Sequence, residues 1–187
     1  MTKGEALRDR TAATIIESAA RILAERGEAA TMEEIATSAG IGRATLYRYF
    51  PNREQLLSAM ATASVQELAT RIDEAELEAV PFDEAIARLA RAIIATGSKY
   101  IALSRDSVKH SDDQPDLDAK VIEPIRALFR RAVADAAFRE DLPPDLLMDL
   151  FSGLIKGALD TTASRRRGIE ETAAAVATLF LHGARAS

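Results

Sequence analysis

Cysteine and tryptophan are absent from the 187 residues, and only two histidines occur, His110 and His182. Without cysteine, the chain can form neither a disulfide framework nor a thiolate metal site. The two histidines lie far apart in the sequence, so a zinc site would need carboxylates to complete it. We therefore expect no metal ion and no cofactor.

Long apolar runs are also missing. No stretch of the sequence approaches the 18 apolar residues typical of a membrane-spanning helix. The N-terminus does not have the basic and then apolar pattern of a secretion signal. These two absences predict a soluble cytoplasmic protein without a membrane partner.

The net charge of −5 is unevenly distributed along the chain. Residues 1–60 hold eight Lys or Arg and eight Asp or Glu, whereas residues 61–187 hold 16 and 21. The acidic excess therefore lies entirely in the second part. If the first part binds nucleic acid, it must use a few well-placed cations and amide donors, because it has no broad basic patch.

The composition favours helices throughout. No run of Val, Ile and Thr alternates with polar residues, and helix-forming Ala, Leu, Glu and Arg dominate. An all-α fold follows. Besides two short helices inside Thr31–Phe50, the pattern predicts helices over about 9–26, 52–60, 63–79, 83–103, 117–138, 145–164 and 169–185. The polar stretch 104–116 is the best candidate for an internal loop, and Pro143-Pro144 breaks the helical pattern.

The segment Thr31–Phe50 is the most specific signal in the chain. Thr31 and Glu34 have the spacing of a capping box, and Gly40 can adopt the left-handed conformation that ends a helix. In the second short helix Leu46 is the apolar anchor. Around it the helix carries Arg43, Thr45, Tyr47, Arg48 and Tyr49. This pattern predicts a helix-turn-helix, which is a DNA-binding device.

A dense set of residues in the first 60 positions points to one family. These residues are Ile15, Ile16, Ala19, Ala20, Leu23, Gly27, Thr31, Glu34, Ile35, Ala36, Ala39, Gly40, Ile41, Thr45, Leu46, Tyr47, Tyr49, Phe50, Arg53, Glu54 and Leu56. In this pattern the chain resembles the tetracycline-repressor (TetR) family of bacterial transcription regulators. The family often has lysine where this chain has Arg53, so the positive charge is kept.

The resemblance implies a homodimer of all-α subunits. Each subunit would have a three-helix DNA-binding domain, residues 1–60, and a larger helical domain for effector binding and dimerisation, residues 61–187. An unknown small-molecule effector would change the separation of the two recognition helices and release double-stranded operator DNA. The expected function is a ligand-responsive repressor that binds a palindromic operator.

The resemblance also implies the DNA contacts. Arg43 and Ala44 are expected to meet base edges, where Arg43 can bind a guanine through two hydrogen bonds and Ala44 can offer its methyl group to a thymine. Phosphate contacts are expected from Thr31, Thr45, Tyr47, Tyr49 and Arg53, and Arg48 faces either phosphate or solvent. A basic arm or a solvated tail would hold Lys3, Arg8 and Arg10.

For the larger domain the predictions are less specific. The expected effector site lies among apolar helix faces, with Tyr100, Leu103, Val108, His110, Phe129, Phe151 and Ile155 as candidate lining. Ordinary core packing is the better explanation for most of these. The last two helices are expected to form the dimer interface, because small residues let helices approach closely. Its candidate residues are Gly153, Gly157, Ala173, Ala177 and Phe180.

Three alternatives stay open on the sequence alone. A constitutive or activating DNA-binding regulator would share every N-terminal feature. An all-α enzyme would need a nucleophile with its base or a set of metal ligands, and the chain offers no cysteine and no paired histidines. An all-α ligand-binding protein that does not bind DNA is disfavoured by Thr45, Tyr47, Tyr49 and Arg53.

Overall fold

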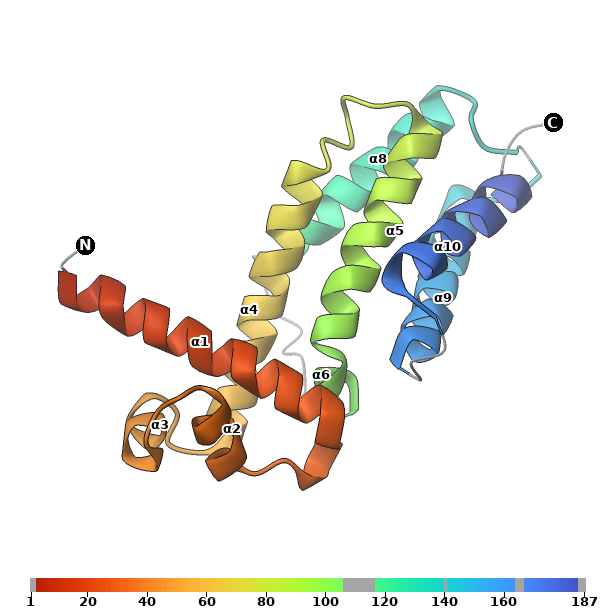
Figure 1. The fold of residues 1–187 in the computed structure, drawn as a ribbon. Coiled ribbons are helices and arrows are strands. Elements are labelled where there is room, and N and C mark those ends of the chain that lie inside the picture. The colour runs from red at the N-terminus through yellow and green to blue at the C-terminus, as the bar shows by residue number, and fades with distance from the viewer. Residues whose placement is uncertain (1–2, 106–116, 140, 164–166, 185–187) are drawn as a thin grey trace. The chain divides into compact units, whose positions relative to one another are not determined.

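The structure, a computed structural model, describes residues 3–105, 117–139, 141–163 and 167–184 (Figure 1). Within these ranges all extended regular elements are helices, and an isolated bridge at Phe138 is the one trace of strand pairing. The predicted all-α class is confirmed. No helix in the described ranges is long and apolar enough to cross a membrane. His110, Val108 and most of the predicted loop 104–116 lie outside the described residues.

The chain forms two compact units, each with its own core. Unit 1 consists of the described residues of Met1–Ser64 and Lys99–His110, and unit 2 of those of Val65–Ser98 and Ser111–Ser187. Unit 1 holds α1 (Lys3–Arg26), η1 (Gly27–Ala29), α2 (Met32–Ser38), α3 (Arg43–Tyr49), the start of α4 (Arg53–Glu74) and α6 (Ile101–Arg105). Unit 2 holds the rest of α4, α5 (Phe82–Lys99) without its last residue, η2 (Asp118–Ile122), α8 (Glu123–Ala134), α9 (Pro144–Ala163) and α10 (Ile169–Ala184).

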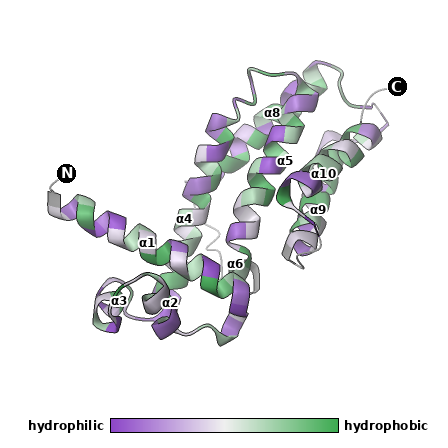
Figure 2. Cartoon of the chain, in the orientation of Figure 1, coloured by the Kyte–Doolittle hydropathy of each residue, from purple (hydrophilic) through white to green (hydrophobic). Residues whose placement is uncertain are grey.

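The core of unit 1 is mainly aliphatic, with Phe50 and Tyr100 as its buried aromatic residues. Hydrophilic and hydrophobic bands alternate along its helices, as expected of amphipathic segments that bury one face (Figure 2). The fully buried side chains come from α1, α2, α3 and α4: Ile15, Leu23, Ile35, Leu46, Leu56 and Met60. Tyr100 and Leu103 complete this core from the α6 segment.

The core of unit 2 contains five of the six phenylalanines of the chain. Their contacting rings have centroids 5.0–6.3 Å apart, and the members are Phe82, Phe129, Phe138, Phe151 and Phe180. Edge-to-face and tilted ring pairs of this kind contribute about 0.5–1.5 kcal/mol each beyond the burial of apolar area. Phe129, Phe138 and Phe180 each contact three other rings, so they lie at the centre of the cluster.

Two helices run further than the sequence patterns predicted. α1 begins at Lys3 rather than near Asp9: Gly4 does not prevent this extension, and Glu5 in the first turn favours the helix dipole. α4 continues unbroken from Arg53 to Glu74, where the sequence predicted one helix to about residue 60 and a second over 63–79. No Gly or Pro occurs between Arg53 and Glu78, so nothing interrupts the helix until Glu76 adopts a positive φ of 46°.

Two other predicted helices are shorter. α5 ends at Lys99 and a separate short helix follows, whereas one helix to Leu103 was predicted. The predicted helix 117–138 divides into a π-helical turn and α8, with Pro124 in the first turn of α8. Because proline has no N–H to donate to the carbonyl of residue 120, regular α-helix begins only around it. α8 then ends at Ala134, just before Ala136 with a φ of 50°.

Candidate nucleic-acid interface

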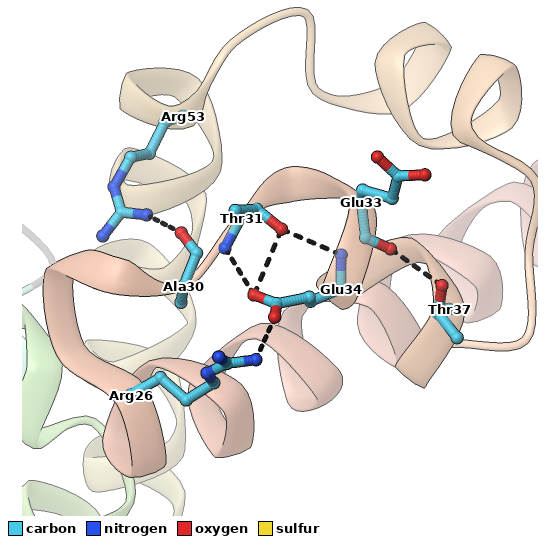
Figure 3. Close-up of polar contacts among 7 residues, drawn as sticks. All are labelled: Arg26, Ala30, Thr31, Glu33, Glu34, Thr37 and Arg53. Atoms are coloured by element: carbon cyan, nitrogen blue, oxygen red, sulfur yellow. Dashed lines mark hydrogen bonds and ion pairs between the residues drawn. The ribbon is translucent and has the colours of Figure 1, made fainter.

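A reciprocal cap fixes the start of α2 (Figure 3). The Thr31 hydroxyl accepts a hydrogen bond from the backbone N–H of Glu34 at 3.2 Å, and the backbone N–H of Thr31 donates to the Glu34 carboxylate at 2.9 Å. Arg26 of α1 forms an ion pair with the same carboxylate. The hydrogen bond from the Thr31 backbone is the largest cause of a pKa of Glu34 below its usual value. The predicted capping box is confirmed, and it ties α2 to α1.

The turn between α2 and α3 sets the direction of α3. Gly40 has a φ of 68°, as predicted, and the backbone N–H of Ile41 donates to the Ala36 carbonyl at 3.0 Å. A residue with a Cβ is strained in this conformation, so glycine is favoured here. Gly42 is the N-cap residue of α3, so Arg43 is the first helical residue. Leu46 is fully buried and holds α3 against the core of unit 1.

The burial of Leu46 leaves a polar and aromatic face of α3 in solvent. The exposed side chains are Arg43, Ala44, Tyr47 and Arg48. Arg43 is not unpaired: its Nη1 lies 3.3 Å from a carboxylate oxygen of Glu33 on α2. The predicted base readers Arg43 and Ala44 therefore share one accessible face, and Arg43 has an acidic neighbour ten residues earlier in the chain, which no local spacing rule predicts.

Other predicted phosphate contacts have structural partners within unit 1. Thr45 and Tyr49 are half-buried. Arg53, at the start of α4, donates from Nη1 to the carbonyl of Ala30 at 2.7 Å (Figure 3). This hydrogen bond connects α4 to the segment before α2. Arg53 thus stabilises the packing of α4 against the segment before α2. Its contact with a phosphate stays a prediction.

The N-terminal part of α1 also contributes to this surface. Arg8 is exposed and its guanidinium carbon lies 6.0 Å from the centre of the Tyr49 ring, while that of Arg48 lies 5.8 Å from the same centre. Arg8 therefore lies in a helix and contacts the end of α3. It is not part of an unstructured tail.

The predicted effector residues do not gather in one site. Tyr100 and Leu103 are buried in the core of unit 1, whereas Phe129, Phe151 and Ile155 are buried in the core of unit 2. A cavity of about 840 Å³ lies elsewhere in unit 2, between the end of α4, the turn after it and the start of α8. Its lining consists of Gln66, Ala69, Thr70, Ile72, Asp73, Glu76, Leu77, Glu78, Ala79, Ala119, Lys120 and Pro124.

The predicted dimer residues divide into two groups. Gly153 and Gly157 are exposed on α9, but Ala173, Ala177 and Phe180 of α10 are buried in the core of the same subunit. Other side chains of α9 and α10 reach solvent instead, among them Leu146, Leu150 and Leu179. Periodicity along the sequence did not identify these exposed apolar residues as candidates for the dimer interface. The reason is that periodicity cannot tell which apolar face of α10 points inward.

No group of three or more His, Cys, Asp or Glu among the described residues is arranged to hold a metal ion.

Comparison with known proteins gives concordant matches. The family model for bacterial regulatory proteins of the tetR family matches residues 15–60. The transcriptional regulator NfxB of Pseudomonas aeruginosa is 27% identical over 158 residues, which cover 83% of this chain and 84% of NfxB. The transcriptional repressor LfrR of Mycolicibacterium smegmatis is 39% identical over 83 residues, covering 44% of this chain and 43% of LfrR.

A solved structure extends the similarity to nearly the whole chain. The crystal structure of LfrR from Mycobacterium smegmatis in complex with proflavine superposes with a TM-score of 0.72 at 26% identity, over 93% of this chain and 96% of that one. The residues matched by the family model, 15–60, include the capping box, the glycine turn and the exposed face of α3 described above.

Proposed function

We propose that this chain, which belongs to the tetR family of bacterial regulatory proteins, represses transcription as a homodimer that a small-molecule effector releases from a palindromic operator. As a member of the family it is a DNA-binding transcription regulator. The observation that carries the proposal is the exposed face of α3, where Arg43, Ala44, Tyr47 and Arg48 surround a fully buried Leu46. A helix presented in this way can enter the major groove.

The neutral charge of the DNA-binding part determines how it can bind. Several of its arginines already have partners within unit 1: Arg26 with Glu34, Arg43 with Glu33, and Arg53 with the Ala30 carbonyl. Few cations are left for non-specific contact with phosphates, so base contacts and the spacing of two half-sites must supply much of the operator preference.

A homodimer is supported by an exposed face on α9 and α10, which pack side by side (Figure 1). On α9, Leu146, Leu150, Gly153 and Gly157 follow one another at intervals of four, three and four residues, and all four are exposed. On α10, Leu179 is 65% exposed. Contiguous exposed apolar residues of this kind mark interaction sites, and the family supports a second copy of this chain as the occupant.

The effector is assigned to the cavity in unit 2. Its volume of about 840 Å³ lies within the range of small-molecule sites. Asp73, Glu76 and Glu78 line it together with Lys120, so we expect an effector with a positively charged group. The LfrR structure with bound proflavine supports a small-molecule effector for this fold. An effector acts only if it binds the DNA-competent and DNA-incompetent arrangements of the dimer with different affinity.

The test is a titration of the purified protein against the DNA upstream of its own gene and against a random duplex of equal length. We expect a clear preference for the upstream DNA at physiological salt. Arg43→Ala should remove about 1–3 kcal/mol of that preference, the value of one bidentate contact with guanine. Arg91→Ala, which breaks an exposed ion pair with Glu170 in unit 2, is the control and should bind as wild type does. Equal binding of both duplexes by the wild-type protein would refute a specific regulator.

A further inference from the structure

The surface of unit 1 next to the recognition helix contains two arginines that converge on one aromatic ring. Arg8 comes from α1 and Arg48 from α3, and both guanidinium carbons lie within about 6 Å of the centre of the Tyr49 ring, at 6.0 Å and 5.8 Å. Forty residues of sequence separate the two arginines. Their meeting depends on the unexpected extension of α1 to Lys3.

Neither arginine is neutralised. Within the described part of the chain, no carboxylate lies within 4 Å of the guanidinium of Arg8 or of Arg48. Arg26 at the end of α1 and Arg43 of α3 differ in this respect, since each pairs with a glutamate. Two cations without a carboxylate partner therefore lie beside the same ring, and a nearby anion would offset their charge.

The Tyr49 ring restricts the positions of both guanidinium groups before such an anion binds. Tyr49 is half-buried, so the ring is held by unit 1 and offers a firm surface. A guanidinium that stacks on an aromatic face loses less freedom when it binds, and its planar array of donors matches the oxygens of a phosphate. Lysine at either position would keep the charge but lose this planar contact.

We propose that Arg8 and Arg48, held by Tyr49, form a phosphate clamp that grips the DNA backbone next to the major groove occupied by α3. The proposal rests on the proposed function, since it assumes that α3 binds duplex DNA. It adds α1 to the contact surface and gives Arg48 a phosphate role. The clamp supplies sequence-independent affinity in a DNA-binding part with no net charge, whereas Arg43 supplies sequence preference.

Arg10 offers a matched control for Arg8. It lies two residues further along α1, is equally exposed, and is turned by roughly 200° around the helix axis, away from the Tyr49 ring. Arg8→Ala and Arg10→Ala therefore remove the same charge from the same helix. A general electrostatic effect changes both variants alike, and the clamp changes only the first.

The experiment measures Kd by fluorescence anisotropy over a series of salt concentrations, on the upstream DNA and on a random duplex. Arg8→Ala should weaken binding to both duplexes by a similar factor, about two- to fivefold, and lower the slope of log Kd against log salt by about 0.9. Arg8→Lys should keep the slope and bind with intermediate affinity. Arg10→Ala should match wild type.

Three outcomes separate the two proposals. If the wild-type protein prefers the upstream DNA but Arg8→Ala behaves like Arg10→Ala, the clamp is refuted and the regulator stands. If wild type binds both duplexes equally and Arg8→Ala still lowers the salt slope, the specific regulator fails and the clamp stands. Loss of binding to the upstream DNA alone in Arg8→Ala would also overturn the clamp, because a phosphate contact does not read sequence.

Discussion

In the proposed contact with DNA, Arg43 has a carboxylate already beside it. Its Nη1 lies 3.3 Å from Glu33, and both side chains are more than 60% exposed. The carboxylate repels phosphates, so it makes non-specific approach of this face to DNA less favourable. In the major groove the same carboxylate can accept a hydrogen bond from the amino group of a cytosine, while Arg43 binds a guanine. The pair thus favours sequence preference over affinity.

Replacing Glu33 by Gln tests this role. We expect Glu33→Gln to bind a random duplex more tightly than wild type, since one repulsive charge is removed, and to show a smaller ratio of upstream to random affinity. Anisotropy titrations on both duplexes give this ratio. Glu25→Gln removes the same charge from α1 without touching α3 and should leave the ratio unchanged. An unchanged ratio in Glu33→Gln would mean that Glu33 takes no part in discrimination.

The capping box makes the stability of unit 1 depend on pH. The hydrogen bond from the Thr31 backbone, and then the Thr31 hydroxyl and Arg26, hold the pKa of Glu34 below its usual value of 4.5. A group with a lowered folded-state pKa stabilises the fold above its unfolded-state pKa, and this stabilisation is lost as the pH falls through the folded-state value.

Glu34→Gln should therefore lower the free energy of unfolding at pH 7, and the difference from wild type should shrink as the pH falls below about 4.5. Urea unfolding followed by circular dichroism at a series of pH values measures this. Thr31→Ala is the comparison: it removes the hydroxyl cap of the Glu34 backbone N–H, worth about 1 kcal/mol, and this part of its cost should persist at low pH. Only the smaller part that comes from the hydroxyl contact with the Glu34 carboxylate should disappear with protonation. A constant difference for Glu34→Gln at all pH values would contradict an ionised Glu34 as the stabilising form.

Residue roles were predictable where the signal is local in sequence. Thr31 and Glu34 are three residues apart, and Gly40 closes a turn, so spacing alone identified both. The contact of Arg53 with the Ala30 carbonyl joins residues 23 positions apart. No spacing rule reaches that far, because such a contact exists only after the helices pack.

At the scale of elements, one glycine sets how closely α5 and α9 approach in unit 2. A Cβ built on Gly97 would lie 2.6 Å from Cδ2 of Leu159, well inside normal contact. One position further along α5, the Ser98 hydroxyl is 2.9 Å from that of Thr162 on α9. Gly97 is costly in the middle of a helix by about 0.5–1 kcal/mol relative to Ala, and the close approach explains its presence.

The effect of Gly97→Ala should change sign with its neighbour. In the wild-type background we expect a loss of about 1–2 kcal/mol, since Leu159 must move away from the new methyl group. In a Leu159→Ala background, the same substitution should stabilise the protein by about 0.5–1 kcal/mol through helix propensity. Thermal unfolding of the four proteins of this double-mutant cycle measures the coupling. The same sign in both backgrounds would show that Leu159 does not set the approach.

The helices themselves followed from composition, but several of their ends did not. Gly40 acts locally and was identified correctly. Asn52 also acts locally, since its side chain accepts a hydrogen bond from the backbone N–H of Gln55 at 2.8 Å. The continuity of α4 past Met60 and the end of α5 at Lys99 depend on which residues each core buries. Tyr100 illustrates this: it is buried in unit 1, directly after a helix that packs in unit 2.

At the scale of the whole molecule, the proposed function requires two copies of this chain. Residues 61–187 carry the entire net charge of −5, so two such parts repel each other at long range and need close contact to hold together. The exposed face of α9 and α10 provides it, with Leu150 51% exposed and Leu179 65% exposed. A charge placed in the middle of that face would have to be buried without a partner on dimerisation, which is strongly unfavourable.

Leu150→Glu should therefore shift the protein from dimer to monomer while leaving each subunit folded, because Leu150 lies outside the core of unit 2. Light scattering after size exclusion gives the mass, and circular dichroism gives the helix content. Val133→Glu is the matched control: Val133 is 47% exposed on α8 of the same unit, and its substitution should leave a dimer.

The monomer should bind a single half-site as weakly as wild type does, and should lose the gain in affinity from a second half-site in register. A Leu150→Glu protein that remains a dimer, or a wild-type monomer at micromolar concentration, would exclude this face as the interface, and operator symmetry would then need another source.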